Sequence, residues 1–214
     1  MSVKLLIFDW DGTLCDSLSR ISHCVDLAAK EHGFYLSNSL DAKEVIGLGL
    51  KESFETLFVG ANKKQIALMC ASYSKNFIHL DKIPSQMYEG AMDSLKYFKN
   101  QGYLLAVATG KSRNGLNRVL KEKKMTDFFD ISRCSDETAS KPNPLMLLEI
   151  LQKLNISPED SIMVGDTEYD LAMAVNAKVP SIAVNYGAHS PSRLKKYQPL
   201  CFIDKILEIK YHLN

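Results

Sequence analysis

The sequence has no excess of charge of either sign. Its 214 residues include 26 lysines and arginines against 25 aspartates and glutamates, a formal net charge of +1. A nucleic-acid-binding domain, or a protein drawn to an anionic membrane surface, needs a surplus of basic residues. We therefore expect neither nucleic acid nor a membrane as a partner. Hydrophobic residues at 46% and charged residues at 24% are typical of a globular protein and exclude a disordered or fibrous class.

The chain also lacks paired cysteines and long apolar runs. Its five cysteines contain no CxxC pair, and an odd number cannot all pair within one chain. This pattern favours reduced thiols and a cytoplasmic location. The apolar stretch before Asp9 is too short for a signal peptide or a membrane span. The sequence leaves open whether the protein is a monomer or a homodimer.

Short apolar runs alternate with amphipathic segments along most of the chain. Four runs predict buried strands, because each is aliphatic and stops at a polar residue or a glycine: 3–8, 103–108, 161–164 and 180–184. The segments 90–100, 116–120 and 145–154 carry apolar residues at helical spacing. This alternation predicts an α/β fold with a mostly parallel, Rossmann-like sheet and helices on both faces.

Residues 17–83 break the alternation. They show helical patterns, such as Ile21, Val25 and Ala28, but no convincing strand. We predict a small all-helical domain at 17–83, inserted after the first strand into an α/β core domain formed by 1–16 and 84–214. Ligands of parallel α/β sheets bind beyond the carboxyl ends of the strands. An insert that leaves the chain there can act as a cap over the site.

Carboxylates gather where the predicted strands end. Asp9 and Asp11 follow the first strand two residues apart, so their side chains start from the same side of the chain. Asp166 and Asp170 follow the strand at 161–164, and a parallel sheet brings them to the same edge. Oxygen ligands at this density favour Mg²⁺ as the cofactor.

Three other groups reach the same edge. Thr109 offers a hydroxyl, Gly110 an approachable backbone and Lys141 a positive charge. With a metal ion, such groups neutralise a phosphoryl group during its transfer. One carboxylate would attack phosphorus to form an aspartyl-phosphate, while another would exchange protons with the leaving oxygen and with water. These residues predict an enzyme that acts on a small phosphorylated metabolite.

Four motifs resemble those of the haloacid dehalogenase superfamily of phosphohydrolases, in the same order and over nearly the whole chain. They are Asp9-Trp10-Asp11-Gly12-Thr13-Leu14, Thr109-Gly110-Lys111, Lys141-Pro142-Asn143-Pro144 and Gly165-Asp166-Thr167-Glu168-Tyr169-Asp170. The helical insert, with Val45-Ile46-Gly47-Leu48-Gly49-Leu50, looks like the cap of phosphoglycolate phosphatase-like members. Gly47 and Gly49 fit either a turn inside that cap or a contact with substrate.

The resemblance implies the chemical roles. Asp9 would be the nucleophile and a metal ligand, and Asp166 a further metal ligand. Asp11 would be the general acid and base, with a backbone carbonyl that also binds Mg²⁺. We expect Asp9 to lie at a solvent-facing strand end, so that its replacement by asparagine leaves folding largely intact.

The resemblance also implies how the phosphoryl group is held. Thr109 and Gly110 would bind its oxygens, and Lys141 would neutralise charge on the nucleophile and the phosphate. Asp170 would orient Lys141 or a metal-bound water. An aspartate at this place can equally cap a helix.

The favoured reaction is hydrolysis of a small phosphomonoester, with phosphoglycolate as the first substrate suggested. A pyrophosphatase, or a phosphomutase of the β-phosphoglucomutase kind, would need the same four motifs. A dehalogenase needs neither the metal nor the acid at Asp11, and a phosphonate hydrolase needs a Schiff-base lysine in the cap. A non-catalytic phospho-acceptor or binding protein is disfavoured because Asp11 supplies a proton donor for turnover.

Overall fold

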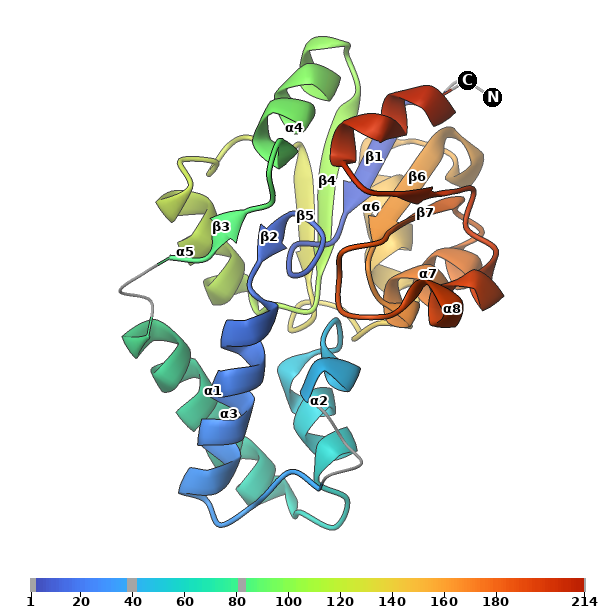
Figure 1. The fold of residues 1–214 in the computed structure, drawn as a ribbon. Coiled ribbons are helices and arrows are strands. Elements are labelled where there is room, and N and C mark those ends of the chain that lie inside the picture. The colour runs from blue at the N-terminus through green and yellow to red at the C-terminus, as the bar shows by residue number, and fades with distance from the viewer. Residues whose placement is uncertain (1–2, 38–41, 81–83, 214) are drawn as a thin grey trace.

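The computed structural model describes residues 3–37, 42–80 and 84–213. At its centre lies a sheet of six strands (Figure 1). Neighbouring strands run parallel, in the order β5-β4-β1-β6-β7-β8. The strands are β1 (Leu5–Phe8), β4 (Leu104–Thr109), β5 (Ile131–Cys134), β6 (Ser161–Gly165), β7 (Ser181–Val184) and β8 (Phe202–Ile203). The predicted Rossmann-like parallel sheet is confirmed.

Two strands of this sheet are additional to the four that the sequence predicts. Both β5 and β8 lie at the edges of the sheet, where a strand is paired on one side only. The residues of β5 are Ile-Ser-Arg-Cys, and three of the four are only partly buried. An edge strand of this kind does not need the continuous apolar run by which a central parallel strand is recognised.

Helices cover both faces of the sheet, as expected. On one face lie α4 (Ala91–Asn100), α5 (Arg113–Glu122) and the 3₁₀ segment η4 (Ile206–His212). The other face carries α6 (Leu145–Leu154) and α7 (Glu168–Ala177). Shorter elements are the 3₁₀ segments η2 (Pro158–Asp160) and η3 (Lys195–Tyr197), and the helix α8 (Pro191–Leu194).

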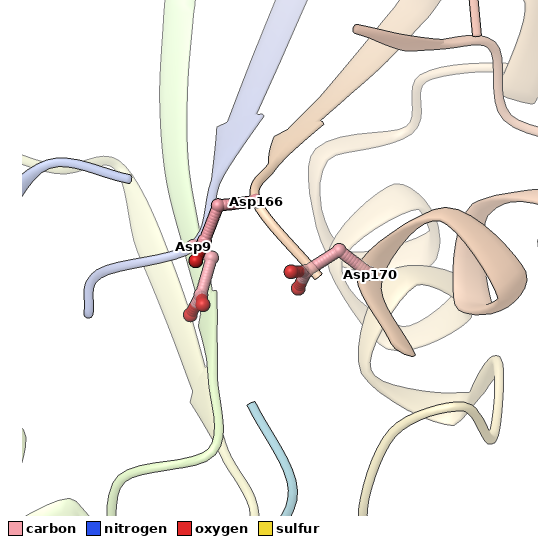
Figure 2. A group of neighbouring side chains, drawn as sticks. All are labelled: Asp9, Asp166 and Asp170. Atoms are coloured by element: carbon pink, nitrogen blue, oxygen red, sulfur yellow. The ribbon is translucent and has the colours of Figure 1, made fainter. Parts of the chain in front are cut away.

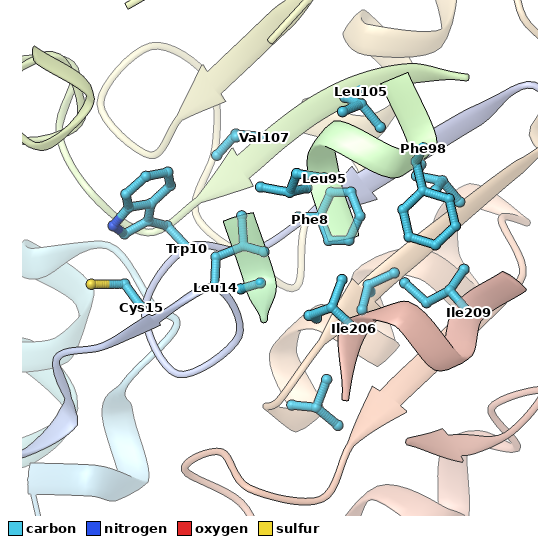
Figure 3. Close-up of a cluster of buried hydrophobic side chains, with 14 of the residues drawn as sticks. Phe8, Trp10, Leu14, Cys15, Leu95, Phe98, Leu105, Val107, Ile206 and Ile209 are labelled. Carbon is cyan, nitrogen blue, oxygen red and sulfur yellow. The ribbon is translucent and has the colours of Figure 1, made fainter. Parts of the chain in front are cut away.

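The strand β1 explains why both faces must be covered. Leu6 and Phe8 pack in one apolar cluster with α4 and η4 (Figure 3), while Leu5 and Ile7 pack in a second cluster with α6 and α7. All four side chains are fully buried. Side chains alternate along a strand, so a strand buried on both faces is apolar at every position. Trp10 belongs to the first cluster, with its ring edge against Phe129.

The described residues between β2 (Cys15–Asp16) and β3 (Gln86–Met87) form a helical insert. It contains α1 (Leu18–Glu31), the 3₁₀ segment η1 (Ala42–Val45), α2 (Leu50–Leu57) and α3 (Lys63–His79), and it lies beyond the carboxyl ends of the strands (Figure 1). A separate apolar cluster holds these helices together, with Phe54 and Met69 fully buried in it. The chain leaves and re-enters the sheet region through the antiparallel pair of β2 and β3.

Two further expectations concern the whole chain. All five cysteines are free thiols. None of the helices in the described ranges has the length and apolar content of a membrane span.

Candidate active site

Three predicted aspartates meet at the carboxyl ends of β1 and β6. Phe8 and Val164 are partners in the parallel pairing. Asp9, which follows β1, therefore lies level with Gly165, the last residue of β6, and Asp166 comes next. Asp170 points toward them from the first turn of α7 (Figure 2). Asp9, Asp166 and Asp170 are all buried and offer carboxylate oxygens within 4.8 Å of one another.

Lys141 joins two of these carboxylates. Its Nζ lies 2.9 Å from Asp9 Oδ1 and 2.6 Å from Asp170 Oδ1, and its side chain has no exposed surface. Burial alone would lower the pKa of this lysine, but Asp170 and Asp9 raise it above the ordinary value. Lys141 is therefore held as a cation between Asp9 and Asp170.

When its three buried carboxyl groups are ionised, the cluster carries more negative charge than the one ammonium group offsets. Burial raises the pKa of Asp9 to about 7, and the neighbouring Asp170 and Asp11 act in the same direction. Burial also raises the pKa of Asp166 well above its ordinary range. Among the described residues Asp9 Oδ2 has no hydrogen-bond partner. An oxygen-rich site with surplus negative charge and a free carboxylate oxygen suits a hard divalent cation such as Mg²⁺.

Asp166 is held in place by neighbours from two loops, one after β1 and one after β7. Its Oδ1 accepts a hydrogen bond from Thr13 Oγ1 at 2.8 Å, and its Oδ2 accepts one from the Ala188 backbone N–H at 2.8 Å. Gly12 has φ +82°, and a Cβ there would stand 2.2 Å from Asp166 Oδ2. Thr13 lies within the first motif and could have been assigned from it, whereas no sequence pattern marks Ala188.

Asp170 contacts both Lys141 and the start of α7. Its Oδ2 accepts hydrogen bonds from the Thr167 backbone N–H at 3.0 Å and from Thr167 Oγ1 at 2.7 Å, while Thr167 caps the Asp170 N–H in return. This reciprocal capping box begins α7. Its other oxygen faces Lys141.

Asp11 lies apart from the three-carboxylate cluster. Its Oδ2 is 2.9 Å from Lys111 Nζ, and its Oδ1 accepts a hydrogen bond from Ser17 Oγ. Asp9 and Asp11 both line the cavity between the sheet edge and the insert. Lys111 lies in the second motif, but no role was expected for it.

The expectation that Asp9 lies at a solvent-facing strand end was wrong. Asp9 is only 1% exposed. Lys141 and Asp166 pack around its carboxylate, and the helical insert lies beyond the strand ends where solvent was expected.

Thr109 and Gly110 end β4 beside β1. Thr109 is fully buried, and its Oγ1 accepts a hydrogen bond from the Lys111 backbone N–H at 3.2 Å. A Cβ on Gly110 would stand 2.4 Å from the carbonyl oxygen of Leu48. Gly110 therefore allows the insert to approach the end of β4, and it lines the cavity with Lys111.

The Gly47 loop of the insert closes over the site. Gly47 has φ +99° and lines the cavity, and a Cβ there would stand 2.8 Å from Thr167 Oγ1. Gly49 donates its N–H to Ser140 Oγ at 2.7 Å. Gly47 thus lies in a turn, one of the two alternatives that the sequence left open, and it also lines the cavity.

A second set of contacts joins the insert to the sheet domain. The guanidinium of Arg193 pairs with Glu44 of η1 and with Glu168 of α7. Tyr169 donates its hydroxyl to the Glu44 carbonyl oxygen at 2.8 Å. No sequence motif marks Arg193, which lies 149 residues from Glu44.

Comparison with known proteins agrees with this geometry. Residues 6–184 match the haloacid dehalogenase-like hydrolase family. The chain is 31% identical to the probable phosphatase IndB of Dickeya dadantii, over 96% of this chain and 91% of that protein. It is 28% identical to the pyrophosphatase PpaX of Bacillus mycoides, over 98% and 96% of the two chains.

A third relative and a solved structure are also similar to this chain over nearly its whole length. The phosphoglycolate phosphatase of Nitrosococcus oceani is 27% identical, over 99% of this chain and 96% of that protein. A haloacid dehalogenase-like family hydrolase from Streptococcus pneumoniae superposes with a TM-score of 0.82 at 27% identity, covering 99% of each chain. The resemblance seen in the four motifs is confirmed.

Proposed function

The chain belongs to the haloacid dehalogenase-like hydrolases, and within that family of phosphatases we propose that it is a Mg²⁺-dependent enzyme that hydrolyses a small phosphomonoester through an aspartyl-phosphate. The observation that carries this proposal is the buried contact of Lys141 with Asp9 and Asp170, 2.9 and 2.6 Å away, beside Asp166. A nucleophilic carboxylate next to a fixed cation is the arrangement that phosphoryl transfer requires.

The proposed reaction has two steps. An Asp9 carboxylate oxygen attacks phosphorus, the bond from phosphorus to the ester oxygen breaks, and Asp11 gives a proton to that oxygen as the alcohol leaves. Asp11 then takes a proton from water, whose oxygen attacks phosphorus and releases phosphate and the Asp9 carboxylate. Both aspartates line the same cavity, and Lys111 holds the Asp11 carboxylate at 2.9 Å.

The other predicted residues hold the phosphoryl group and the cation. We assign Thr109 and Gly110, at the end of β4, and Lys141 to the phosphoryl oxygens. Asp9 and Asp166 would hold Mg²⁺ through their carboxylates, with the Asp11 backbone carbonyl as a further ligand. When bound, Mg²⁺ supplies positive charge that offsets the phosphoryl oxygens. Asp170 positions Lys141.

We also propose that residues 17–83 act as a cap domain on a core formed by 1–16 and 84–214. The antiparallel pair β2 and β3 stands where the chain leaves and re-enters the core, and the insert has an apolar cluster of its own. The boundary at 83 lies outside the described residues. A cap that closes over the strand ends would exclude water from the site.

A pyrophosphatase is the second candidate, because one relative with 28% identity over nearly the whole chain carries that name. Such an enzyme would use the same aspartates and release phosphate as the leaving group. A phosphomutase would transfer the phosphoryl group from Asp9 to a sugar hydroxyl.

The reduced thiols agree with a cytoplasmic enzyme, the location that we propose.

A phosphate-release screen tests these assignments. Purified protein is incubated with phosphoglycolate, pyrophosphate, sugar phosphates, nucleotides and an aryl phosphate, with Mg²⁺ or with EDTA. We expect Mg²⁺-dependent release that is abolished in Asp9→Asn. Asp11→Asn should lower kcat by roughly 10²- to 10⁴-fold, the usual contribution of a positioned acid and base. Release that persists in EDTA or in Asp9→Asn would refute the mechanism.

A further inference from the structure

Resting on the proposed phosphatase function, we infer that the alcohol part of the substrate is uncharged and has a hydrocarbon body that packs against the insert. A cavity of about 360 Å³ lies between the strand ends and the helices α1 and α3. Pockets that enclose a whole small organic molecule have volumes of roughly 300 to 1,000 Å³.

The wall of this cavity on the insert side is apolar. It includes Ile21 and Val25 from α1, Val45 and Ile46 around the end of η1, and Tyr73 and Phe77 from α3. No charged side chain lies among the described insert residues that line the cavity. A buried carboxylate or phosphate needs a cation or several donors beside it. Arg20 of α1 lies 5.6 Å from the centre of the Phe77 ring but is not among the residues that line this cavity.

The few polar groups of this wall do not change its character. Ser53 donates hydrogen bonds to the carbonyl oxygens of Val45 and Gly49, at 3.1 and 3.0 Å, so its hydroxyl proton is used within the insert. Burial raises the pKa of the Tyr73 phenol well above its ordinary value, so this side chain stays neutral. Ser74 lines the same cavity but is exposed.

The cations that line the cavity, within the described ranges, reach it from the sheet domain. Lys111 pairs with Asp11, and its Nζ lies 5.1 Å from the centre of the Phe77 ring. Arg118 of α5 stacks over the same ring at 5.1 Å. The positive charge therefore lies beside Asp11 and over Phe77. The other apolar side chains of the wall, Ile21, Val25, Val45 and Ile46, bound the rest of the insert side with hydrocarbon.

The apolar wall on the insert side disfavours the two substrates that the names of the relatives suggest, phosphoglycolate and pyrophosphate. A two-carbon acid such as glycolate would place a carboxylate next to the apolar wall and fill little of the cavity. The second phosphate of pyrophosphate would carry even more charge into the same place. A phosphate ester of an alkyl or arylalkyl alcohol would instead bury its carbon atoms there, and each buried methylene favours binding by about fourfold.

A series of primary alkyl phosphates tests the inference, because their leaving groups are chemically alike. Ethyl, butyl, hexyl and 2-phenylethyl phosphate are compared with phosphoglycolate and pyrophosphate by kcat/KM at saturating Mg²⁺. We expect kcat/KM to rise on the order of 100-fold from ethyl to hexyl phosphate. Hexyl or 2-phenylethyl phosphate should be the best substrate of the set.

Variants of the wall supply the matched control. Ile78 lies at the end of α3, lines the cavity and is 60% exposed, so Ile78→Asn should fold normally. We expect Ile78→Asn and Ile21→Asn to lower the hexyl-to-ethyl ratio by roughly 5- to 10-fold. Leu68 is an exposed apolar residue of the same helix that does not line the cavity, and Leu68→Asn should leave the ratio unchanged.

The outcomes separate this inference from the proposed function. Equal kcat/KM across the alkyl series, or a preference for phosphoglycolate or pyrophosphate over hexyl phosphate, overturns the inference and leaves the phosphatase intact. If no compound is hydrolysed, the proposed function fails. Titration calorimetry with ethyl and hexyl phosphate then decides by itself whether the cavity takes a hydrocarbon group, and equal affinities would refute it.

Discussion

Asp170 contacts Lys141 with one carboxylate oxygen, at 2.6 Å, and caps the first turn of α7 with the other, at 3.0 Å from the Thr167 N–H. The position of the lysine is thus coupled to the start of a helix. Because Lys141 also lies 2.9 Å from Asp9, the start of α7 helps to set the position of the proposed nucleophile.

Two variants separate these roles of Asp170. Asp170→Asn keeps an oxygen that can cap the helix but removes the charge that faces Lys141. We expect kcat/KM to fall by roughly 10- to 100-fold, as for other residues that orient a metal ligand or a catalytic group without contacting the substrate. Thr167→Ala removes the cap and should cost about 1 kcal/mol of unfolding free energy while kcat/KM changes by less than fivefold. Phosphate-release kinetics and urea denaturation measure both, and equal losses of activity would contradict this assignment.

Gly12 and Gly102 allow a matched comparison, because both have positive backbone angles, with φ of +82° and +86°. Alanine costs about 1 to 2 kcal/mol in this left-handed region at either place. A Cβ at Gly12 would also stand 2.2 Å from Asp166 Oδ2, whereas the described residues leave open space around Gly102. We expect Gly12→Ala to raise the Mg²⁺ concentration needed for half-maximal activity at least tenfold, and Gly102→Ala to leave it unchanged. A Mg²⁺ titration of phosphate release decides, and parallel behaviour of the two variants would count against Asp166 as a ligand.

The charge of Asp9 predicts how stability depends on pH in EDTA. Its pKa rises from 3.8 to about 7 on folding, so the folded protein binds this proton more tightly than the unfolded chain. The unfolding free energy therefore falls, through this group, as pH rises from about 4 to 7. Asp9→Asn lacks the effect, and we expect its stability relative to wild type to increase between pH 5 and pH 7.5.

Urea denaturation of both proteins in EDTA at pH 5, 6 and 7.5 measures this difference. Added Mg²⁺ should stabilise the wild type more at pH 7.5 than at pH 5, because protons compete with the metal for the carboxylates. A stability difference that does not vary with pH would show that the Asp9 carboxylate is not destabilised by folding.

Because Arg193 pairs with Glu44 of the insert, we expect the loss of this ion pair to weaken closure of the proposed cap. Glu44→Gln removes the charge that pairs η1 with Arg193 and leaves the Glu168 partner in place. Exposed ion pairs contribute about 0.2 to 1 kcal/mol, so we expect KM to rise by roughly 1.5- to 5-fold, and less at high salt. Lys51→Met breaks a pair inside α2, with Glu55 at 3.6 Å, and should not change KM. Steady-state kinetics at two salt concentrations compare them, and the same KM shift in both variants would refute a closing role.

The sequence by itself determined the central strands of the parallel sheet and the place of Asp9, Asp166 and Asp170 at its polar edge. The central strands are largely apolar runs, and three of the four motifs begin where such a run stops, so Asp9 and Asp166 could be placed at neighbouring strand ends from local pattern alone. Edge strands such as β5 lack that run and were missed.

Only the tertiary structure decided how the site is enclosed. The burial of Asp9, the Ala188 N–H that holds Asp166, and the pairing of Arg193 with Glu44 depend on loops that meet across long stretches of chain. The apolar wall likewise combines α1 with α3, whose side chains face one cavity only after the helices pack. Hydrophobic periodicity records which residues are buried within an element, but it carries no information on which distant element will cover them.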